Sequence, residues 1–170
     1  MNQKTLIMIY YSLIYSFITY AVTIWGNACD TFTNSIYKLQ KKTVRLITFN
    51  DSSYIKPHSA PLFNTLKILT IYDIYKIETL KFVYDCLNKC NPHQFHDYYC
   101  YPSTNRNTAV NREVNLNTPQ VRTTTYGLRS LKYNGVILWN NVPLSIGFYK
   151  RRNLFSKALK DFFILSYANE

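Results

Sequence analysis

The feature that most constrains the fold is a long uncharged run near the start of the chain. No charged residue occurs between Lys4 and Asp30, and the intervening sequence includes LIMIYYSLIYSFITYAVTIWGN. A helix of about 20 apolar residues is long enough to cross a bilayer. The basic residues that follow the run would then place the rest of the chain in the cytoplasm. The run is therefore either a membrane-spanning helix or an apolar helix of a protein core.

Periodicity within the run does not separate these two interpretations. Ser12, Ser16, Thr19 and Thr23 are spaced by four, three and four residues, so they form one narrow stripe along a helix. A stripe of small residues suits close packing against another helix, either in a core or in a bilayer. The other side of the helix carries Ile14, Phe17, Ile18, Ala21, Ile24 and Trp25. A small membrane protein anchored by residues 6–25 remains open at this point.

The charge balance restricts the classes of partner and of chemistry. Twenty Lys and Arg against nine Asp and Glu give a net charge of +11, and 16 of the 170 residues are tyrosine. A chain this basic is typical of proteins that bind nucleic acid or an anionic membrane surface. The low acid count disfavours polymerase, nuclease and glycosidase chemistry, which needs placed carboxylates. His58 lies between prolines without a nucleophile motif, which disfavours a hydrolase.

The clearest helical pattern is NSIYKLQKKTVRLITF, residues 34–49, with Asn34 or Ser35 as the expected N-cap. The expected core face consists of apolar residues and one threonine, namely Ile36, Leu39, Thr43, Leu46 and Ile47. The opposite face carries Lys38, Lys41, Lys42 and Arg45 with no acid between them. Four cations in two turns repel one another unless an anion lies nearby. They predict a phosphate-contacting face, and the alternative is an ordinary solvated lysine face.

The remaining sequence indicates a second long helix, a polar arm and a small C-terminal unit. Residues 71–87 are apolar nearly all round, which predicts a helix buried on more than one side, and Thr70 with Asp73 approximates a capping box at its start. Residues 91–125 form a polar, basic linker in which VNREVNLN, residues 110–117, resembles an edge strand. A solvated loop is the simpler alternative for this arm.

The last 45 residues, 126–170, combine turn signals with an amphipathic pattern. Gly127 and Asn134–Gly135 predict a hairpin. A helix capped by Asn153 follows, with its apolar face formed by Phe155, Ala158, Leu159 and Phe162. Lys150, Arg151 and Arg152 precede that helix and form a second candidate phosphate site. The expected fold is mainly α, with a helical unit (1–90), the polar linker (91–125) and a small α+β unit (126–170).

A cysteine–histidine cluster lies after the second long helix. In CLNKCNPHQFHDYYC, a tetrahedral zinc site would take Cys86, Cys90, His96 and Cys100 as ligands. The spacing is not that of a standard zinc knuckle, and a cysteine such as Cys86 within an apolar helix is often core filler. We therefore expect no cofactor in this chain, with zinc at these residues as the alternative.

Five motifs in a fixed order resemble the C-terminal part of reverse transcriptases from Jockey-like non-LTR (LINE-type) retrotransposons. They are YYSLIYSFITYAVTIWGN, LQKKTVRLIT, HSAPLFNTLKILTIYDIYKIETLKFVYDCLN, LRSLKYNGVILWNNVP and FSKALKDFFI, and together they span nearly the whole chain. The matching positions include Trp25–Gly26, Gln40 with Lys41, Lys42 and Arg45, Pro61–Leu62–Phe63, Leu138–Trp139–Asn140, and Pro143.

The resemblance implies a thumb-like region that follows the polymerase palm and holds RNA template and DNA primer. It implies that the uncharged N-terminal run is a soluble helix, that Trp25, Phe63 and Trp139 are packing residues, and that Lys41, Lys42 and Arg45 contact phosphate. The family's palm carries paired aspartates for magnesium, and this chain has no adjacent Asp-Asp. We therefore expect a non-catalytic fragment that lacks the palm and binds RNA and RNA–DNA hybrid, in the nucleus or cytoplasm rather than a membrane. A helical module that binds protein through its aromatic surfaces remains a third interpretation.

Overall fold

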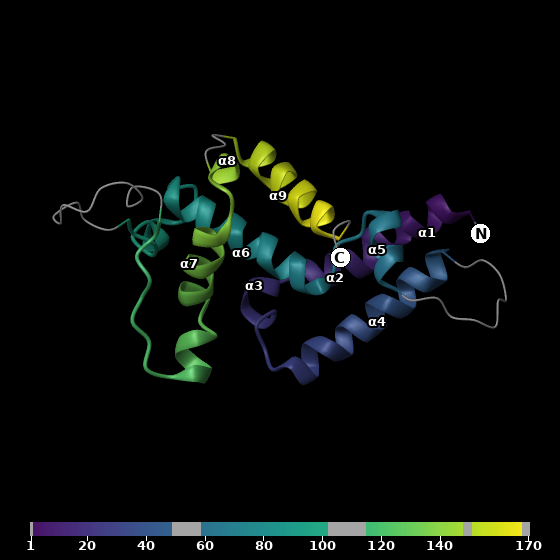
Figure 1. Ribbon diagram of the computed structural model, residues 1–170, viewed down its shortest axis with the longest axis horizontal. Helices are drawn as coiled ribbons and strands as arrows, with labels where there is room; N and C mark the ends of the chain where they lie inside the picture. Colours follow the sequence, from purple (N-terminus) through teal and green to yellow (C-terminus); the bar gives the residue numbers. More distant parts are fainter. Residues whose placement is uncertain (1, 49–58, 102–114, 148–150, 168–170) are drawn as a thin grey trace. The chain divides into compact units, whose positions relative to one another are not determined.

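The computed structural model describes residues 2–48, 59–101, 115–147 and 151–167, and all regular structure in these ranges is helical. The prediction of a mainly α fold is therefore confirmed. The expected edge strand lies outside the described residues except for Asn115, Leu116 and Asn117, which are not in a strand. The helices (Figure 1) are α1 (Gln3–Ile9), η1 (Tyr10–Tyr15), α2 (Ser16–Thr19), α3 (Val22–Trp25), α4 (Asp30–Thr48), α5 (Ala60–Leu66), α6 (Ile71–Leu87), η2 (His93–Phe95), η3 (Thr124–Leu128), α7 (Leu131–Asn141), α8 (Leu144–Gly147) and α9 (Arg152–Ser166).

The chain divides into two compact units. Unit 1 comprises Met1–Tyr75 and Lys160–Glu170, and unit 2 comprises Lys76–Leu159. Helices α6 and α9 each contribute residues to both units. The division into three regions that composition suggested stays a prediction.

The core of unit 1 forms where α4 packs against α1 and α5. Its buried side chains include Tyr10, Val44, Ile47, Phe63 and Ile68. The burial of Phe63 confirms that it is a packing residue. Burying side chains of this size contributes about 1.5–3 kcal/mol each, so this cluster is a main source of stability for the unit.

The uncharged N-terminal run is not one continuous helix. Residues from Gln3 to Thr19 are helical, with a π-helical stretch at Tyr10–Tyr15, but Tyr20 is extended and Ala21 is left-handed with φ 50°. Among the described residues, no helix combines the length and apolar character needed to span a membrane. The chain then starts a new short helix, α3, at Val22.

The hydroxyl groups of the small polar residues that form the stripe in this helical run are hydrogen-bonded to the backbone of the run itself. The hydroxyl groups of Ser12, Ser16 and Thr19 donate to backbone carbonyls three and four residues earlier, at 2.8–3.3 Å. Such bonds supply donors to carbonyls in and beside a π-helical turn. Ser12 and Ser16 are exposed, so the stripe does not mediate close helix packing within the described structure.

The core-facing side of α4 differs from the prediction. The buried residues are Thr33, Gln40, Val44 and Ile47, whereas Leu39 and Leu46 are 61% and 69% exposed. The core face is thus rotated by roughly one residue, about 100°, from the predicted one. Because Thr33 and Gln40 are polar, the apolar pattern did not include them in the predicted core face. The helix also begins at Asp30, four residues before the expected N-cap at Asn34.

Helix α6 has the predicted bounds and the predicted start. The Thr70 hydroxyl lies 2.6 Å from a carboxylate oxygen of Asp73, and the Asp73 N–H donates to that hydroxyl at 3.4 Å. The hydroxyl of Tyr167, the residue directly after α9, donates to the same carboxylate and accepts from the Thr70 N–H. Residues on several sides of α6 are buried, as expected, including Ile74, Leu80 and Val83.

Unit 2 contains a helix where the hairpin was predicted. Asn134 and Gly135 lie inside α7, whose N-cap is Ser130, with the Ser130 hydroxyl accepting from the Tyr133 N–H at 3.2 Å. Gly135 serves a close approach instead of a turn, because a Cβ there would collide with the Tyr99 side chain and crowd Val83 of α6. Helix α7 crosses the unit-2 part of α6 at this point (Figure 1). The prediction of an α+β C-terminal unit was therefore wrong for the described residues.

Two further contacts organise unit 2. The Asn140 side chain makes paired hydrogen bonds with the backbone of Leu116, at 2.9 and 3.1 Å, and so fixes the segment that precedes η3. Phe155 of α9 stacks on Tyr84 with ring centroids 4.5 Å apart, and the ring of Trp139 lies 6.0 Å away. Phe155 and Leu159 are fully buried, as predicted, whereas α9 begins at Arg152 and not after an Asn153 cap.

Candidate nucleic-acid interface

Four of the candidate phosphate-binding residues lie on one side of α4. Lys38, Lys41, Lys42 and Arg45 occupy positions i, i+3, i+4 and i+7 of a continuous helix, so they form a single stripe of about two turns. Lys38 and Lys42 are exposed, and Lys41 and Arg45 are half-buried. Within the described residues none of the four pairs with a carboxylate. The helix has one acid, Asp30 in its first turn.

Aromatic packing holds the second cation of this stripe. The Lys41 ammonium nitrogen lies 4.2 Å from the centroid of the Tyr37 ring. That ring in turn packs against Phe63 and Tyr72, with centroids 6.1 and 5.3 Å apart. A cation above an aromatic face is attracted by the ring quadrupole, which orients the side chain without neutralising its charge. Lys41 therefore keeps its charge available at a defined position.

The Arg45 side chain is half-buried. Its Nε atom is buried and has no hydrogen-bond partner within the described residues. A buried guanidinium nitrogen without an acceptor is unfavourable.

Gln40 fixes α4 from the opposite side. Its amide nitrogen donates to the Tyr10 hydroxyl at 2.9 Å and to the Leu69 carbonyl at 2.8 Å, while its amide oxygen accepts from the Ile71 N–H at 3.0 Å. The side chain is 1% exposed. These bonds tie α4 to the N-terminal helical run and to the start of α6. The cationic stripe consequently lies on a helix whose other face is rigidly anchored.

Burial of this hydrogen-bond cluster also perturbs the Tyr10 hydroxyl. Desolvation raises the pKa of Tyr10 to about 12, and the hydrogen bond donated by Gln40 opposes part of that rise. Tyr10 therefore remains neutral across the physiological range.

Sequence reasoning missed the structural roles of Gln40 and Tyr37. The available signal was the spacing of residues 33, 37, 40, 44 and 47, which follows a helical period as well as the predicted face does. Because Thr33 and Gln40 in that row are polar, the row does not look like a core face in the sequence.

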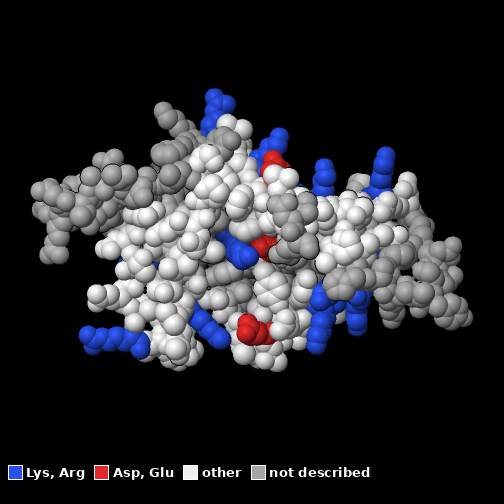
Figure 2. Space-filling model, viewed as in Figure 1, with Lys and Arg blue, Asp and Glu red and all other residues white. Residues whose placement is uncertain are grey.

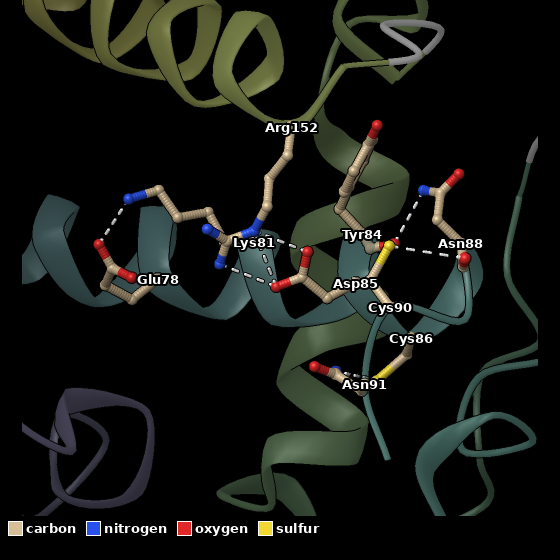
Figure 3. Close-up of polar contacts among 9 residues, drawn as sticks. All are labelled: Glu78, Lys81, Tyr84, Asp85, Cys86, Asn88, Cys90, Asn91 and Arg152. Carbon is tan, nitrogen blue, oxygen red and sulfur yellow. Dashed lines mark hydrogen bonds and ion pairs between the residues drawn. The ribbon is translucent and has the colours of Figure 1, made fainter. Parts of the chain in front are cut away.

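The second candidate phosphate site is only partly described. Lys150 lies outside the described residues, and Arg151 is exposed. Arg152 donates from Nε and Nη2 to the buried carboxylate of Asp85, at 2.8–3.1 Å (Figure 3). These hydrogen bonds raise the pKa of the Arg152 guanidinium. Arg152 thus has a structural partner, and its role in phosphate binding stays a prediction.

The four candidate zinc ligands do not form a cluster in the described structure. Cys86 is buried and accepts from the Asn91 side-chain amide at 3.3 Å, whereas Cys90 is exposed and donates to the Asn88 carbonyl at 3.6 Å (Figure 3). A ring nitrogen of His96 lies 2.8 Å from the Asn91 carbonyl oxygen, and Cys100 is exposed. Across the described ranges no three His, Cys, Asp or Glu side chains are grouped to hold a metal ion. All four cysteines are free thiols, and burial raises the pKa of Cys86.

Positive charges also outnumber negative charges on the molecule as a whole. Figure 2 shows one face of the molecule, on which Lys and Arg side chains project at more places than Asp and Glu. A net charge of +11 produces a long-range attraction for polyanions.

Comparison with protein-family models, with curated proteins and with solved structures found no match.

Proposed function

We propose that this chain binds RNA and RNA–DNA hybrid through the cationic stripe of α4, as the non-catalytic C-terminal part of a non-LTR retrotransposon reverse transcriptase. The observation that carries the binding proposal is the set Lys38, Lys41, Lys42 and Arg45, which shares one anchored helix face and has no carboxylate partner in the described residues. The link to reverse transcriptases is supported by the order of the five sequence motifs.

The geometry suits contact with a phosphate backbone. Along an α-helix the four cations cover about 10 Å, from the 1.5 Å rise per residue over seven positions. Adjacent phosphates on one strand are separated by a few ångströms along the duplex axis, so two or three can be contacted together. Contacts of this kind position a duplex without reading its sequence. In this proposal the chain binds template and primer, while polymerisation requires the aspartates of a palm.

The binding test compares two triple variants with the same charge. Lys41→Ala/Lys42→Ala/Arg45→Ala removes two lysines and one arginine from the stripe. Lys4→Ala/Arg122→Ala/Lys157→Ala removes the same residue types from exposed positions outside α4. Both variants have a formal net charge of +8, from +11 minus 3.

Affinity for a fluorescent RNA–DNA hybrid is then measured by anisotropy, with circular dichroism to verify that each variant is folded. We expect the α4 variant to bind at least about tenfold more weakly than the control variant, because each phosphate contact adds to affinity. Equal weakening in both variants would show that net charge alone governs binding and would refute the assignment to α4.

A further inference from the structure

Helix α4 carries a second apolar row that the core does not use. Phe32, Leu39 and Leu46 are 69%, 61% and 69% exposed, and Ile36 and Thr43 lie between them half-buried. The spacing along the chain is four, three, four and three residues, which is the a/d pattern of a coiled-coil seam. An isolated exposed leucine is ordinary, whereas five aligned positions form a continuous strip along the helix.

This row, which we call the outer seam, is distinct from the core face of the same helix. The core face consists of Thr33, Gln40, Val44 and Ile47, and its polar members are hydrogen-bonded within unit 1. The outer seam can therefore pack against the side chains of another helix, while the core face holds α4 in place. Its polar member, Thr43, donates to the Leu39 carbonyl at 3.1 Å, so covering the seam leaves no hydroxyl without a partner.

Charge beside the seam indicates the kind of helix that fits. Lys42 lies three residues after Leu39 and four before Leu46, the flanking position of a heptad, and Lys38 and Arg45 lie further round the same side. An acidic side chain at the facing position of a partner would pair with Lys42. A second copy packed antiparallel would instead bring Lys42 toward its own counterpart, and phosphates do not match an apolar strip.

We propose that the outer seam, Phe32, Ile36, Leu39, Thr43 and Leu46, is the docking site for an acidic amphipathic helix of a partner protein. The seam residues and Lys42 carry this inference independently of nucleic-acid binding. Because Lys42 belongs to both surfaces, such a partner would compete with RNA for it.

The test uses the full chain and two synthetic four-heptad peptides, both with leucine at a and d. One peptide has glutamate at e and g, and the other has lysine there, so that like charges keep each from self-associating. We expect the acidic peptide to bind at least about tenfold more tightly than the basic one, since like charges across the interface are unfavourable.

Variants then locate the site. Leu39→Ala/Leu46→Ala should weaken the acidic peptide by about tenfold or more through lost apolar burial, and should leave hybrid RNA–DNA binding unchanged. The matched control, Leu13→Ala/Phe17→Ala, removes two side chains that are 56% and 79% exposed from the N-terminal helical run of unit 1. It should change neither the binding of the acidic peptide nor that of the RNA–DNA hybrid. Equal affinity for both peptides, or equal loss in both double variants, would overturn the proposal. A different result would also overturn it: the parent binds phosphatidylserine vesicles but not the acidic peptide, and Leu39→Ala/Leu46→Ala loses the vesicle binding. That result would assign the seam to a membrane surface.

Discussion

Replacing Gln40 by methionine should destabilise unit 1 more than any surface change on α4. Methionine has nearly the same length and shape but cannot replace the three hydrogen bonds to Tyr10, Leu69 and Ile71. Each buried group left without a partner costs about 1–3 kcal/mol. The more apolar side chain regains about 1 kcal/mol on burial. We expect a net loss of about 2–8 kcal/mol, a large fraction of the 5–15 kcal/mol typical of a folded domain.

The assay can be confined to unit 1, because Trp25 lies in unit 1 and Trp139 in unit 2. In a Trp139→Phe background, urea denaturation followed by Trp25 fluorescence reports the unfolding of unit 1. Tyr10→Phe removes one of the three bonds and should lose about 1 kcal/mol. Gln3→Met changes an exposed glutamine and should remain within about 0.5 kcal/mol of the parent. If the free energy of unfolding of Gln40→Met lay within about 1 kcal/mol of the parent's, Gln40 would not be the anchor of α4.

Three further changes follow from the packing and backbone of the two units. Gly135→Ala should destabilise unit 2 by about 1–3 kcal/mol through overpacking against Tyr99, and adding Tyr99→Phe should restore part of that in thermal unfolding; no loss in the single variant would contradict the close approach. Ala21→Gly should stabilise unit 1 by about 0.5–1 kcal/mol in urea denaturation because Ala21 is left-handed. Ala158→Gly, in the part of α9 that belongs to unit 2, should destabilise unit 2 by about 1 kcal/mol in thermal unfolding. Because the pKa of Tyr10 is raised from 10.0 to about 12, the folded state keeps a proton that the unfolded state loses, so unit 1 should lose stability as pH rises from 10 to 12. That loss should be smaller in Tyr10→Phe, and an identical pH profile would refute the assignment.

Sequence pattern predicted the helices well where local and tertiary preferences agree. Helix α6 has the predicted bounds because its apolar content and its Thr70–Asp73 cap indicate the same start and the same burial. The hairpin was wrong because Asn134–Gly135, a strong turn signal, serves an interhelical contact with Tyr99 that no local pattern reveals.

The candidate interface was only partly predictable for a similar reason. The four cations of α4 share a face in any helical register, so their grouping follows from spacing alone. The core face of α4 could not be predicted from spacing, because Gln40 is a polar residue that becomes part of the core only through partners 29 to 31 positions away. The break at Ala21 has neither glycine nor proline to mark it, and only the backbone shows it.

The most direct test of the central proposal is the salt dependence of binding to an RNA–DNA hybrid. The logarithm of the association constant is measured against the logarithm of salt concentration for the parent, for Lys41→Ala/Lys42→Ala/Arg45→Ala, and for the equally charged control triple variant. If the α4 stripe contacts phosphates, the parent should show a steep negative slope that becomes shallower by about 2–3 in the α4 variant and remains steep in the control. The same slope in all three proteins would contradict nucleic-acid binding through α4.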